Sequence, residues 1–133
     1  MEKEIENYWH MIREAADFLK DRIERAPQIG LVTGTGLGEG IGSLKIDFMI
    51  DYADIPNFPV STVQSHHGRL AAGKIGAHRV LAMQGRFHLY EGYSPRMVAF
   101  PVRVMQALGV KTLIVTNAAG GLDLSFAPGD IMV

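Results

Sequence analysis

The stretch that decides the fold is an apolar run that leads directly into a turn rich in functional groups. It reads Arg79-Val80-Leu81-Ala82-Met83-Gln84-Gly85-Arg86-Phe87-His88-Leu89-Tyr90-Glu91-Gly92-Tyr93. The run up to Gln84 is typical of a strand buried inside a sheet. The turn that follows carries an arginine, a histidine, a carboxylate and tyrosines. Because plain connectors are short and built from Gly, Asn, Asp or Pro, this turn is predicted to be a functional loop at a strand end.

Composition and charge indicate a single soluble, folded domain. The chain has 133 residues, of which 47% are hydrophobic and 20% charged, with a net charge of −1. This charge gives no indication of nucleic-acid or membrane-surface binding. The chain contains no cysteine, which excludes disulfides and thiolate chemistry. Residues 1–6 are too acidic for a signal peptide, and no apolar run approaches the ~20 residues that span a bilayer, so we expect a cytoplasmic protein.

Hydrophobic spacing predicts two helices. The first is amphipathic and ends before Pro27. Its apolar positions are Ile5, Tyr8, Trp9, Ile12, Ala15, Ala16, Leu19 and Ile23. The second covers residues 97–108, with Pro95 in its first turn and Gly109 at its end. Pro101 inside this run predicts a kink or a late helix start.

Strands are predicted on both sides of the second helix. Residues 29–32 and 112–116 have the composition of buried strands, and residues 46–55 that of an extended strand. Residues 69–75 and 78–83 flank Gly76-Ala77, which indicates a hairpin. The order of strand, helix and strand from residue 78 to residue 116 predicts a βαβ unit with parallel strands.

Two further segments could bind an anion. Gly34-Thr35-Gly36-Leu37-Gly38 follows a predicted strand, and its backbone N–H groups and the Thr35 hydroxyl are suitable donors. The dinucleotide-binding spacing fails because Glu39 and Ile41 stand where the third glycine should be. A phosphate-binding loop and a tight turn are both consistent with this segment. Asn117-Ala118-Ala119-Gly120-Gly121 likewise allows either close approach to a ligand or close helix packing.

Histidines form part of two candidate sites. His66 and His67 are adjacent, so in an extended chain they point to opposite sides, and no further ligand lies at a metal-binding spacing. We therefore expect one of them to line a polar site without a metal. Arg86 suits a phosphate or carboxylate, His88 can donate to the same anion, and Glu91 can orient that histidine. An ion-paired surface loop is the alternative interpretation of this cluster.

The parallel strands predicted above would bring these loops together. Loops that follow parallel strands gather at one edge of the sheet. That edge would present Thr35, Arg86, His88 and the backbone amides near Ala118 to a single anion.

Five strings of the sequence resemble, in this order, the trimeric purine nucleoside phosphorylases. They are Gly34-Thr35-Gly36-Leu37-Gly38, Ile55-Pro56-Asn57-Phe58-Pro59, Gly85-Arg86-Phe87-His88-Leu89-Tyr90-Glu91-Gly92-Tyr93, Phe100-Pro101-Val102-Arg103-Val104 and Val115-Thr116-Asn117-Ala118-Ala119-Gly120-Gly121. The related methylthioadenosine phosphorylases resemble the chain less well in its last string, and the hexameric, bacterial-type phosphorylases lack most of the strings.

The resemblance implies an α/β fold with a central mixed β-sheet flanked by helices. It implies the phosphorolysis of purine ribonucleosides to free base and ribose 1-phosphate, with inorganic phosphate as co-substrate and no metal or organic cofactor. The residues that match the family's phosphate ligands are Thr35, His66, Arg86, His88 and the amide of Ala118. Tyr90 matches a ribose contact, and His88 with Glu91 matches the catalytic network. The resemblance also implies a homo-oligomer, which in the family is a trimer.

The family's chains are much longer, and their purine-recognising residues lie in the later half. The chain is therefore expected to be the N-terminal portion, residues 1–133, of a single phosphorylase domain that is incomplete at its C-terminus. We expect it to hold the phosphate site and part of the ribose site and to be inactive alone. Two alternatives remain: a methylthioadenosine phosphorylase, and a non-catalytic remnant that binds phosphate or self-associates through an open sheet edge.

Overall fold

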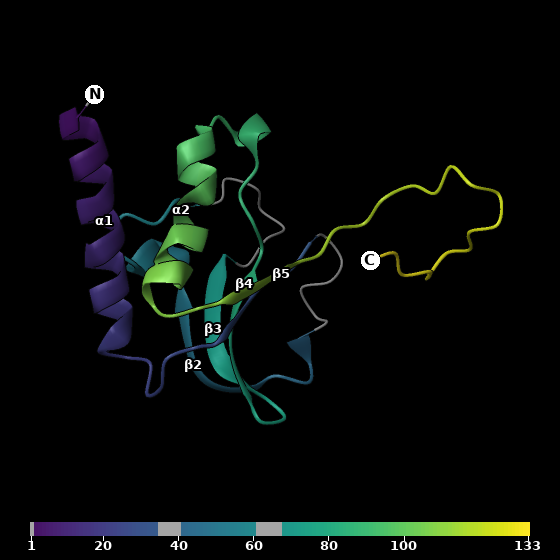
Figure 1. Ribbon diagram of the computed structural model, residues 1–133, viewed down its shortest axis with the longest axis horizontal. Coiled ribbons are helices and arrows are strands. Elements are labelled where there is room, and N and C mark those ends of the chain that lie inside the picture. Colours follow the sequence, from purple (N-terminus) through teal and green to yellow (C-terminus); the bar gives the residue numbers. More distant parts are fainter. Residues whose placement is uncertain (1, 35–40, 61–67) are drawn as a thin grey trace.

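Five strands form one mixed sheet, with two helices packed against one of its faces (Figure 1). The computed structural model describes residues 2–34, 41–60 and 68–133. In chain order the main elements are α1 (Glu2–Lys20), β1 (Ile29–Val32), β2 (Lys45–Asp51), β3 (Arg69–Ile75), β4 (His78–Gln84), α2 (Pro95–Ala107) and β5 (Thr112–Val115). Short 3-10 helices at Tyr52–Asp54 and Leu89–Glu91 follow β2 and β4. The central mixed sheet of the sequence prediction is confirmed.

The strand order places β1 between two parallel neighbours. The order is β2-β3-β4-β1-β5. Ile29 of β1 lies opposite Val80 of β4 on one side and Thr112 of β5 on the other, and both pairings are parallel. β2, β3 and β4 pair in antiparallel fashion. The predicted βαβ unit therefore exists, but its two strands are not neighbours, because β1 lies between them.

Local sequence explains the hairpin and the start of α2. Gly76, at the tip of the β3–β4 hairpin, has a φ of 58°, a value that glycine adopts without the strain a Cβ would cause. The Ser94 hydroxyl accepts a hydrogen bond from the N–H of Met97 over 3.3 Å and caps α2 just before Pro95. Pro101 lies inside the helix with its ring buried in the core. The late helix start was therefore wrong, because the cap and the buried face of α2 set the start at Pro95.

The main core lies between the helices and one face of the sheet. Its fully buried side chains share this interface and include Ile12 and Leu19 of α1, Phe100, Val104 and Met105 of α2, and Leu70, Leu81 and Met83 of the sheet. A smaller cluster on the opposite face joins Ile41 and Leu44 to Ala71, Val80 and Ala82. The helices therefore cover only one of the two faces in the described part of the chain.

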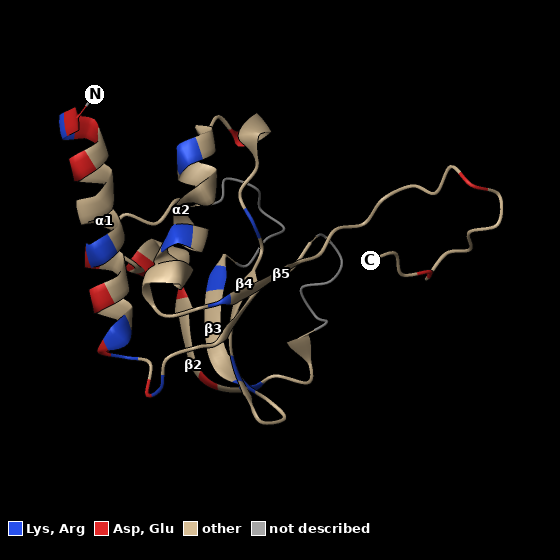
Figure 2. Ribbon diagram, in the orientation of Figure 1, with Lys and Arg blue, Asp and Glu red and all other residues tan. Residues whose placement is uncertain are grey.

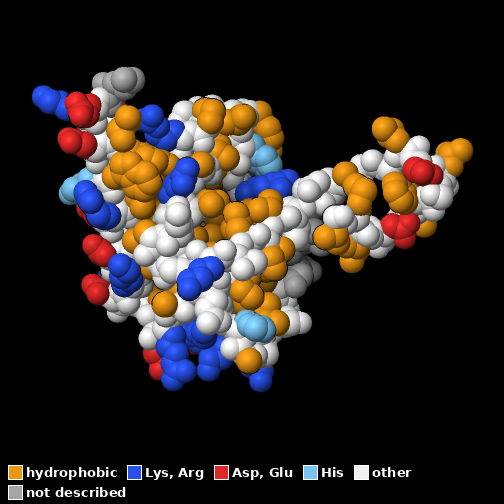
Figure 3. Space-filling view, in the orientation of Figure 1, with side chains coloured by type: hydrophobic (Ala, Val, Ile, Leu, Met, Phe, Trp, Pro, Cys, Tyr) orange, Lys and Arg blue, Asp and Glu red, His pale blue; other side chains and the backbone are white. Residues whose placement is uncertain are grey.

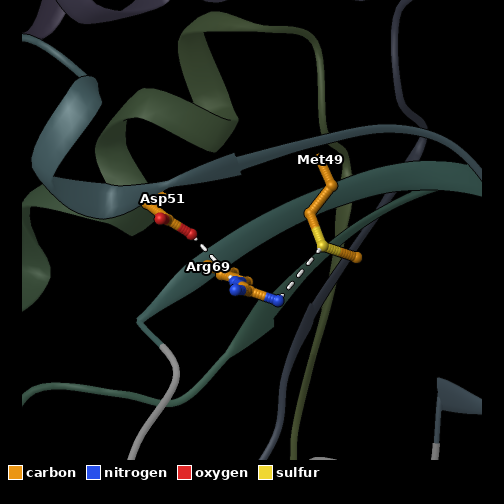
Figure 4. A network of polar contacts seen from close by, with 3 residues as sticks. All are labelled: Met49, Asp51 and Arg69. Carbon is orange, nitrogen blue, oxygen red and sulfur yellow. Dashed lines mark hydrogen bonds and ion pairs between the residues drawn. The ribbon is translucent and has the colours of Figure 1, made fainter.

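Two ion pairs hold β2 to the rest of the sheet. Arg69 of β3 donates through Nε to Asp51 Oδ1 over 2.8 Å, and its Nη1 lies 4.0 Å from the sulfur of Met49 (Figure 4). Arg79 of β4 donates to Asp47 over 2.6 Å, and its side chain is nearly buried. The edge strand β2 therefore supplies the carboxylates, and β3 and β4 supply the arginines.

β5 is exposed, although its sequence predicted a buried strand. All four of its residues are exposed, with Ile114 at 45% and Val115 at 57%. In the described ranges β5 pairs only with β1, and the chain beyond it leaves the body of the molecule (Figure 1). Figure 2 shows that this last segment carries no lysine or arginine, and Figure 3 shows its hydrophobic side chains in the open.

The buried stripe of α1 is also narrower than its periodicity predicted. Ile5 and Trp9 are 43% and 46% exposed because α1 is covered only on the side of α2 and the sheet. Figure 2 shows acidic and basic residues along the length of this helix. Neither α1 nor α2, the longest helices of the described ranges, is apolar enough to cross a membrane.

Candidate functional site

The parallel strands β4, β1 and β5 end at one edge of the sheet. Residues that follow parallel strands leave the sheet on the same side. Thr33 and Gly34 follow β1, Gly85 and Arg86 follow β4, and Thr116 follows β5. The first residues of the three loops therefore lie at the same edge of the sheet, as predicted.

A threonine hydroxyl joins β1 to each of its neighbours. The hydroxyl of Thr33 donates to the carbonyl oxygen of Met83 in β4 over 2.9 Å, in a buried position. The hydroxyl of Thr116 donates to the carbonyl oxygen of Val32 in β1 over 3.3 Å. The same Thr116 oxygen accepts a hydrogen bond from the N–H of Gly34 over 3.1 Å. The ends of the three strands are therefore tied together by side chains beyond the last backbone pairs.

Arg86 closes the arrangement by linking the β4 loop to the β5 loop. Its Nη1 donates to the carbonyl oxygen of Thr116 over 3.1 Å. Arg86 is half-buried, so its guanidinium is held in place while part of it faces solvent. Within the described ranges this bond uses one of the five N–H groups of the guanidinium, which leaves others for an anion.

Gly34 allows the β1 and β5 loops to approach closely. A Cβ at this position would lie 2.8 Å from the carbonyl oxygen of Thr116 and 3.0 Å from the Cα of Asn117. Both neighbours are backbone atoms, which cannot move aside as a flexible side chain can. Gly34 is therefore required by the close packing of the β1 and β5 loops, since its φ does not lie in the left-handed region.

The loop after β4 is anchored by Phe87. Its ring is buried and lies 5.2 Å from the ring of Tyr52 and 5.8 Å from that of Tyr93, measured between centroids. In extended chain, neighbouring side chains point to opposite sides. Arg86 and His88, the neighbours of Phe87, are each only half-buried. The anchor therefore presents both predicted phosphate ligands away from the core.

His88, Tyr90 and Glu91 lie together in the same loop. The rings of His88 and Tyr90 are stacked, with centroids 4.6 Å apart and planes 14° from parallel. Tyr90 is 77% exposed. The carboxylate of Glu91 accepts a hydrogen bond from the backbone N–H of His88 over 2.9 Å. Glu91 thus holds the backbone of the histidine that it was predicted to support.

Tyr52 supports this loop from the core and was not predicted to have a role. Its hydroxyl donates to the carbonyl oxygen of Gly85 over 2.8 Å, immediately before Arg86. Its ring is buried, and this burial raises the pKa of the phenol above its ordinary value. The sequence pattern placed Tyr52 in an extended strand, and its contact with Gly85 spans 33 positions. No local signal could have identified it.

The other predicted ligands are placed only in part. Thr35 and His66, together with His67, lie outside the described residues. Ala118 is exposed on the segment that follows β5. Among the described residues, no group of three or more His, Asp or Glu side chains could hold a metal ion. The ligand roles of Thr35, His66, Arg86, His88 and Ala118 remain predictions.

Comparison with known proteins identifies the family. The model of the phosphorylase superfamily matches residues 28–133. The chain belongs to this superfamily. It is 57% identical over 122 residues to purine nucleoside phosphorylase 1 of Geobacillus stearothermophilus, covering 92% of this chain and 44% of that protein. It is 52% identical over 118 residues to purine nucleoside phosphorylase of Mus musculus, covering 89% of this chain and 41% of that one.

Solved structures of superfamily members share the fold. Isoform 2 of purine nucleoside phosphorylase from Schistosoma mansoni, in complex with cytosine and ribose-1-phosphate, superposes with a TM-score of 0.84 at 43% identity. The match covers 92% of this chain and 43% of that one. Purine nucleoside phosphorylase from the same organism in complex with adenosine has a TM-score of 0.81 at 45% identity. The chain therefore spans less than half the length of these relatives.

Tyr52→Phe is expected to weaken the alkaline loss of stability. The raised pKa means that the folded state holds the phenol proton more tightly than the unfolded state. Its contribution to stability is complete below pH ~10 and is lost as the pH rises above that value. We expect the variant to reduce the fall in unfolding free energy by up to about 1.4 kcal/mol per pH unit, measured by urea unfolding between roughly pH 9 and 11.

At neutral pH the same variant is expected to cost about 1–3 kcal/mol, because the carbonyl oxygen of Gly85 loses its donor. Tyr90→Phe is the matched control, since its side chain is exposed. Equal alkaline slopes for Tyr52→Phe and wild type would contradict the prediction.

Proposed function

We propose that this chain provides the phosphate site and part of the ribose site of a purine nucleoside phosphorylase. Such an enzyme converts a purine ribonucleoside and inorganic phosphate into the free base and ribose 1-phosphate. The observation that carries the proposal is the position of Arg86 where three strand-end loops meet. Its Nη1 donates to the carbonyl oxygen of Thr116 over 3.1 Å. Relatives that bear this name, at 57% and 52% identity, support it.

The chemistry requires an oriented phosphate more than a large positive charge. As the bond between the sugar C1′ and the base breaks, the base leaves with the bonding electron pair and takes up a proton. The sugar becomes oxocarbenium-like, as in other glycoside cleavages. A phosphate oxygen then forms the new bond to C1′. A single guanidinium fixed by a backbone carbonyl can orient the dianion without cancelling the charge that stabilises the sugar.

The proposed roles are those that the family resemblance implies. The phosphate contacts are Thr35, His66, Arg86, His88 and the amide of Ala118. His88 and Tyr90, whose rings are stacked, face the phosphate and the ribose respectively, and Glu91 holds the backbone of His88. Phosphate serves as co-substrate, and no metal or organic cofactor takes part. The protein acts in the cytoplasm and as a homo-oligomer.

Phosphate binding tests the site directly. Arg86→Ala is expected to weaken the affinity for inorganic phosphate by roughly 10- to 100-fold, the range for losing charged hydrogen bonds. Titration calorimetry at constant ionic strength measures this effect. Arg25→Ala is the matched control, because this exposed arginine precedes β1 and lies at the opposite end of that strand from Gly34. Unchanged affinity in Arg86→Ala would remove this residue from the site.

Phosphorolysis by the 133-residue chain is expected to be weak or absent. We infer that the purine-recognising side chains lie in the half of the relatives that this chain does not span. Without them the base is neither oriented nor protonated as it leaves. The measurement is hypoxanthine release from inosine and phosphate by the purified chain. Robust release, at a rate comparable to that of a full-length relative, would contradict this expectation.

Self-association through β5 is a second candidate function, favoured by the contrast between the two sheet edges. β2, at one edge, carries Lys45, Asp47 and Asp51 and has a register shift next to Asp47. Charges and irregularities of this kind protect an edge from pairing with other chains. β5, at the other edge, is an apolar four-residue strand with all of its residues exposed. A second copy of the chain could add to the sheet at β5.

Ile114→Lys is expected to abolish this association. The wild-type chain should form larger species as its concentration rises, measured by sedimentation velocity or light scattering, and the variant should stay monomeric because a charge now lies on the open edge. Ile46→Lys on β2 is the matched control, since this isoleucine is equally exposed on the protected edge. A wild-type chain that remains monomeric at high concentration would rule out the second candidate.

A further inference from the structure

Thr116 alone among the described residues of the site forms hydrogen bonds with both Gly34 and Arg86. Its hydroxyl accepts from the N–H of Gly34 over 3.1 Å and donates to the carbonyl oxygen of Val32 over 3.3 Å. Its own carbonyl oxygen accepts from Nη1 of Arg86 over 3.1 Å. Its backbone N–H also donates to Val32 over 3.0 Å, so the residue continues the β1–β5 ladder.

These contacts fit the hydrogen-bonding capacity of a threonine hydroxyl. The group has one donor and two acceptor positions, so donating to Val32 leaves it free to accept from Gly34. Gly34 is buried, and its N–H would lose this partner if the hydroxyl were removed. A buried donor without a partner is costly, so the backbone at Gly34 would shift to find another.

The two groups that Thr116 holds are the ones that the phosphate proposal depends on. Gly34 begins the glycine-rich segment whose N–H groups are predicted to bind the anion, and Arg86 is the predicted cationic ligand. Backbone amides and a guanidinium bind an anion well only when they are aligned before it arrives. Thr116, directly after β5, thus contacts both Gly34, which follows β1, and Arg86, which follows β4.

We propose that Thr116 is a positioning residue for the phosphate site, acting through its hydroxyl on Gly34 and through its carbonyl on Arg86. The inference rests on the proposed phosphate site and extends it to a residue that does not itself need to touch the anion. It separates the role of the hydroxyl, which a substitution can remove, from that of the carbonyl, which every residue supplies. Thr33, whose hydroxyl donates to Met83, contacts neither group through its side chain in the described ranges.

The test compares Thr116→Val, which keeps the shape but removes the hydroxyl, with Thr116→Ser, which keeps the hydroxyl. Inorganic phosphate is titrated into each ¹⁵N-labelled chain, and affinity is read from amide shifts. Thr116→Val is expected to bind phosphate about fivefold to tenfold more weakly, as for the loss of one partly buried hydrogen bond. Thr116→Ser should bind within about twofold of wild type, because the hydroxyl is restored.

Two further measurements separate positioning from general stability. Thr112→Val is the matched control: this exposed threonine begins β5, the strand that ends just before Thr116, and its hydroxyl makes no hydrogen bond within the described ranges. Its phosphate affinity should equal that of wild type. Amide hydrogen exchange should accelerate at Gly34 in Thr116→Val and stay unchanged in the β3–β4 hairpin, which shows that the sheet remains folded.

The possible results separate the positioning role of Thr116 from the proposed phosphate-binding function. If the wild-type chain binds no phosphate, the proposed function fails and this role of Thr116 fails with it. If wild type binds phosphate and Thr116→Val binds it equally well, the positioning role alone is overturned. Weaker binding in both Thr116→Val and Thr116→Ser would also overturn it, because the hydroxyl would not then be the group responsible.

Discussion

The parallel pairing of β1 with both β4 and β5 sets where the described strand-end residues of the candidate site leave the sheet. In this register Val32 lies level with Met83 on one side and Val115 on the other. The residues that follow therefore leave the sheet at the same height, and hydroxyl groups can bridge them. The register is maintained by burial, since a slip of one residue would exchange Leu81 and Met83 of the main core with the smaller Val80 and Ala82 of the opposite face. The core thus determines the geometry of a site that lies outside it.

Much of the fold could be predicted from the sequence because its signals are local. The apolar run ending at Gln84 predicted β4, and Gly76 predicted the hairpin before it. A predicted βαβ unit was enough to place loops from different strands at one edge, since parallel strands allow no other arrangement. The hydrogen bond from Arg86 to Thr116 joins the loops after β4 and β5, as that prediction requires. The family resemblance added the residues expected to be phosphate and ribose ligands, and all of these roles remain predictions.

The remainder could not be predicted because it depends on which parts of the chain meet. The apolar sequence of β5 indicates a strand that can be buried, but burial also needs a covering element, and in the described ranges none covers it. Tyr52 supports Gly85 across 33 positions, and Thr116 supports Gly34 across 82. Tyrosine and threonine occur at many positions without such a role, so only the folded arrangement shows which ones are used.

The contact between Gly34 and Thr116 has a consequence for the order in which the molecule assembles. Because the two residues are 82 positions apart, closing this contact costs more chain entropy than the local β3–β4 hairpin does. The proposed anion site is therefore completed only when β5 has docked against β1. A ligand that binds this edge lowers the free energy of the fully assembled sheet alone and gives no help to a chain that is still missing its fifth strand. Ligand binding at this edge therefore requires a chain in which the whole sheet has formed.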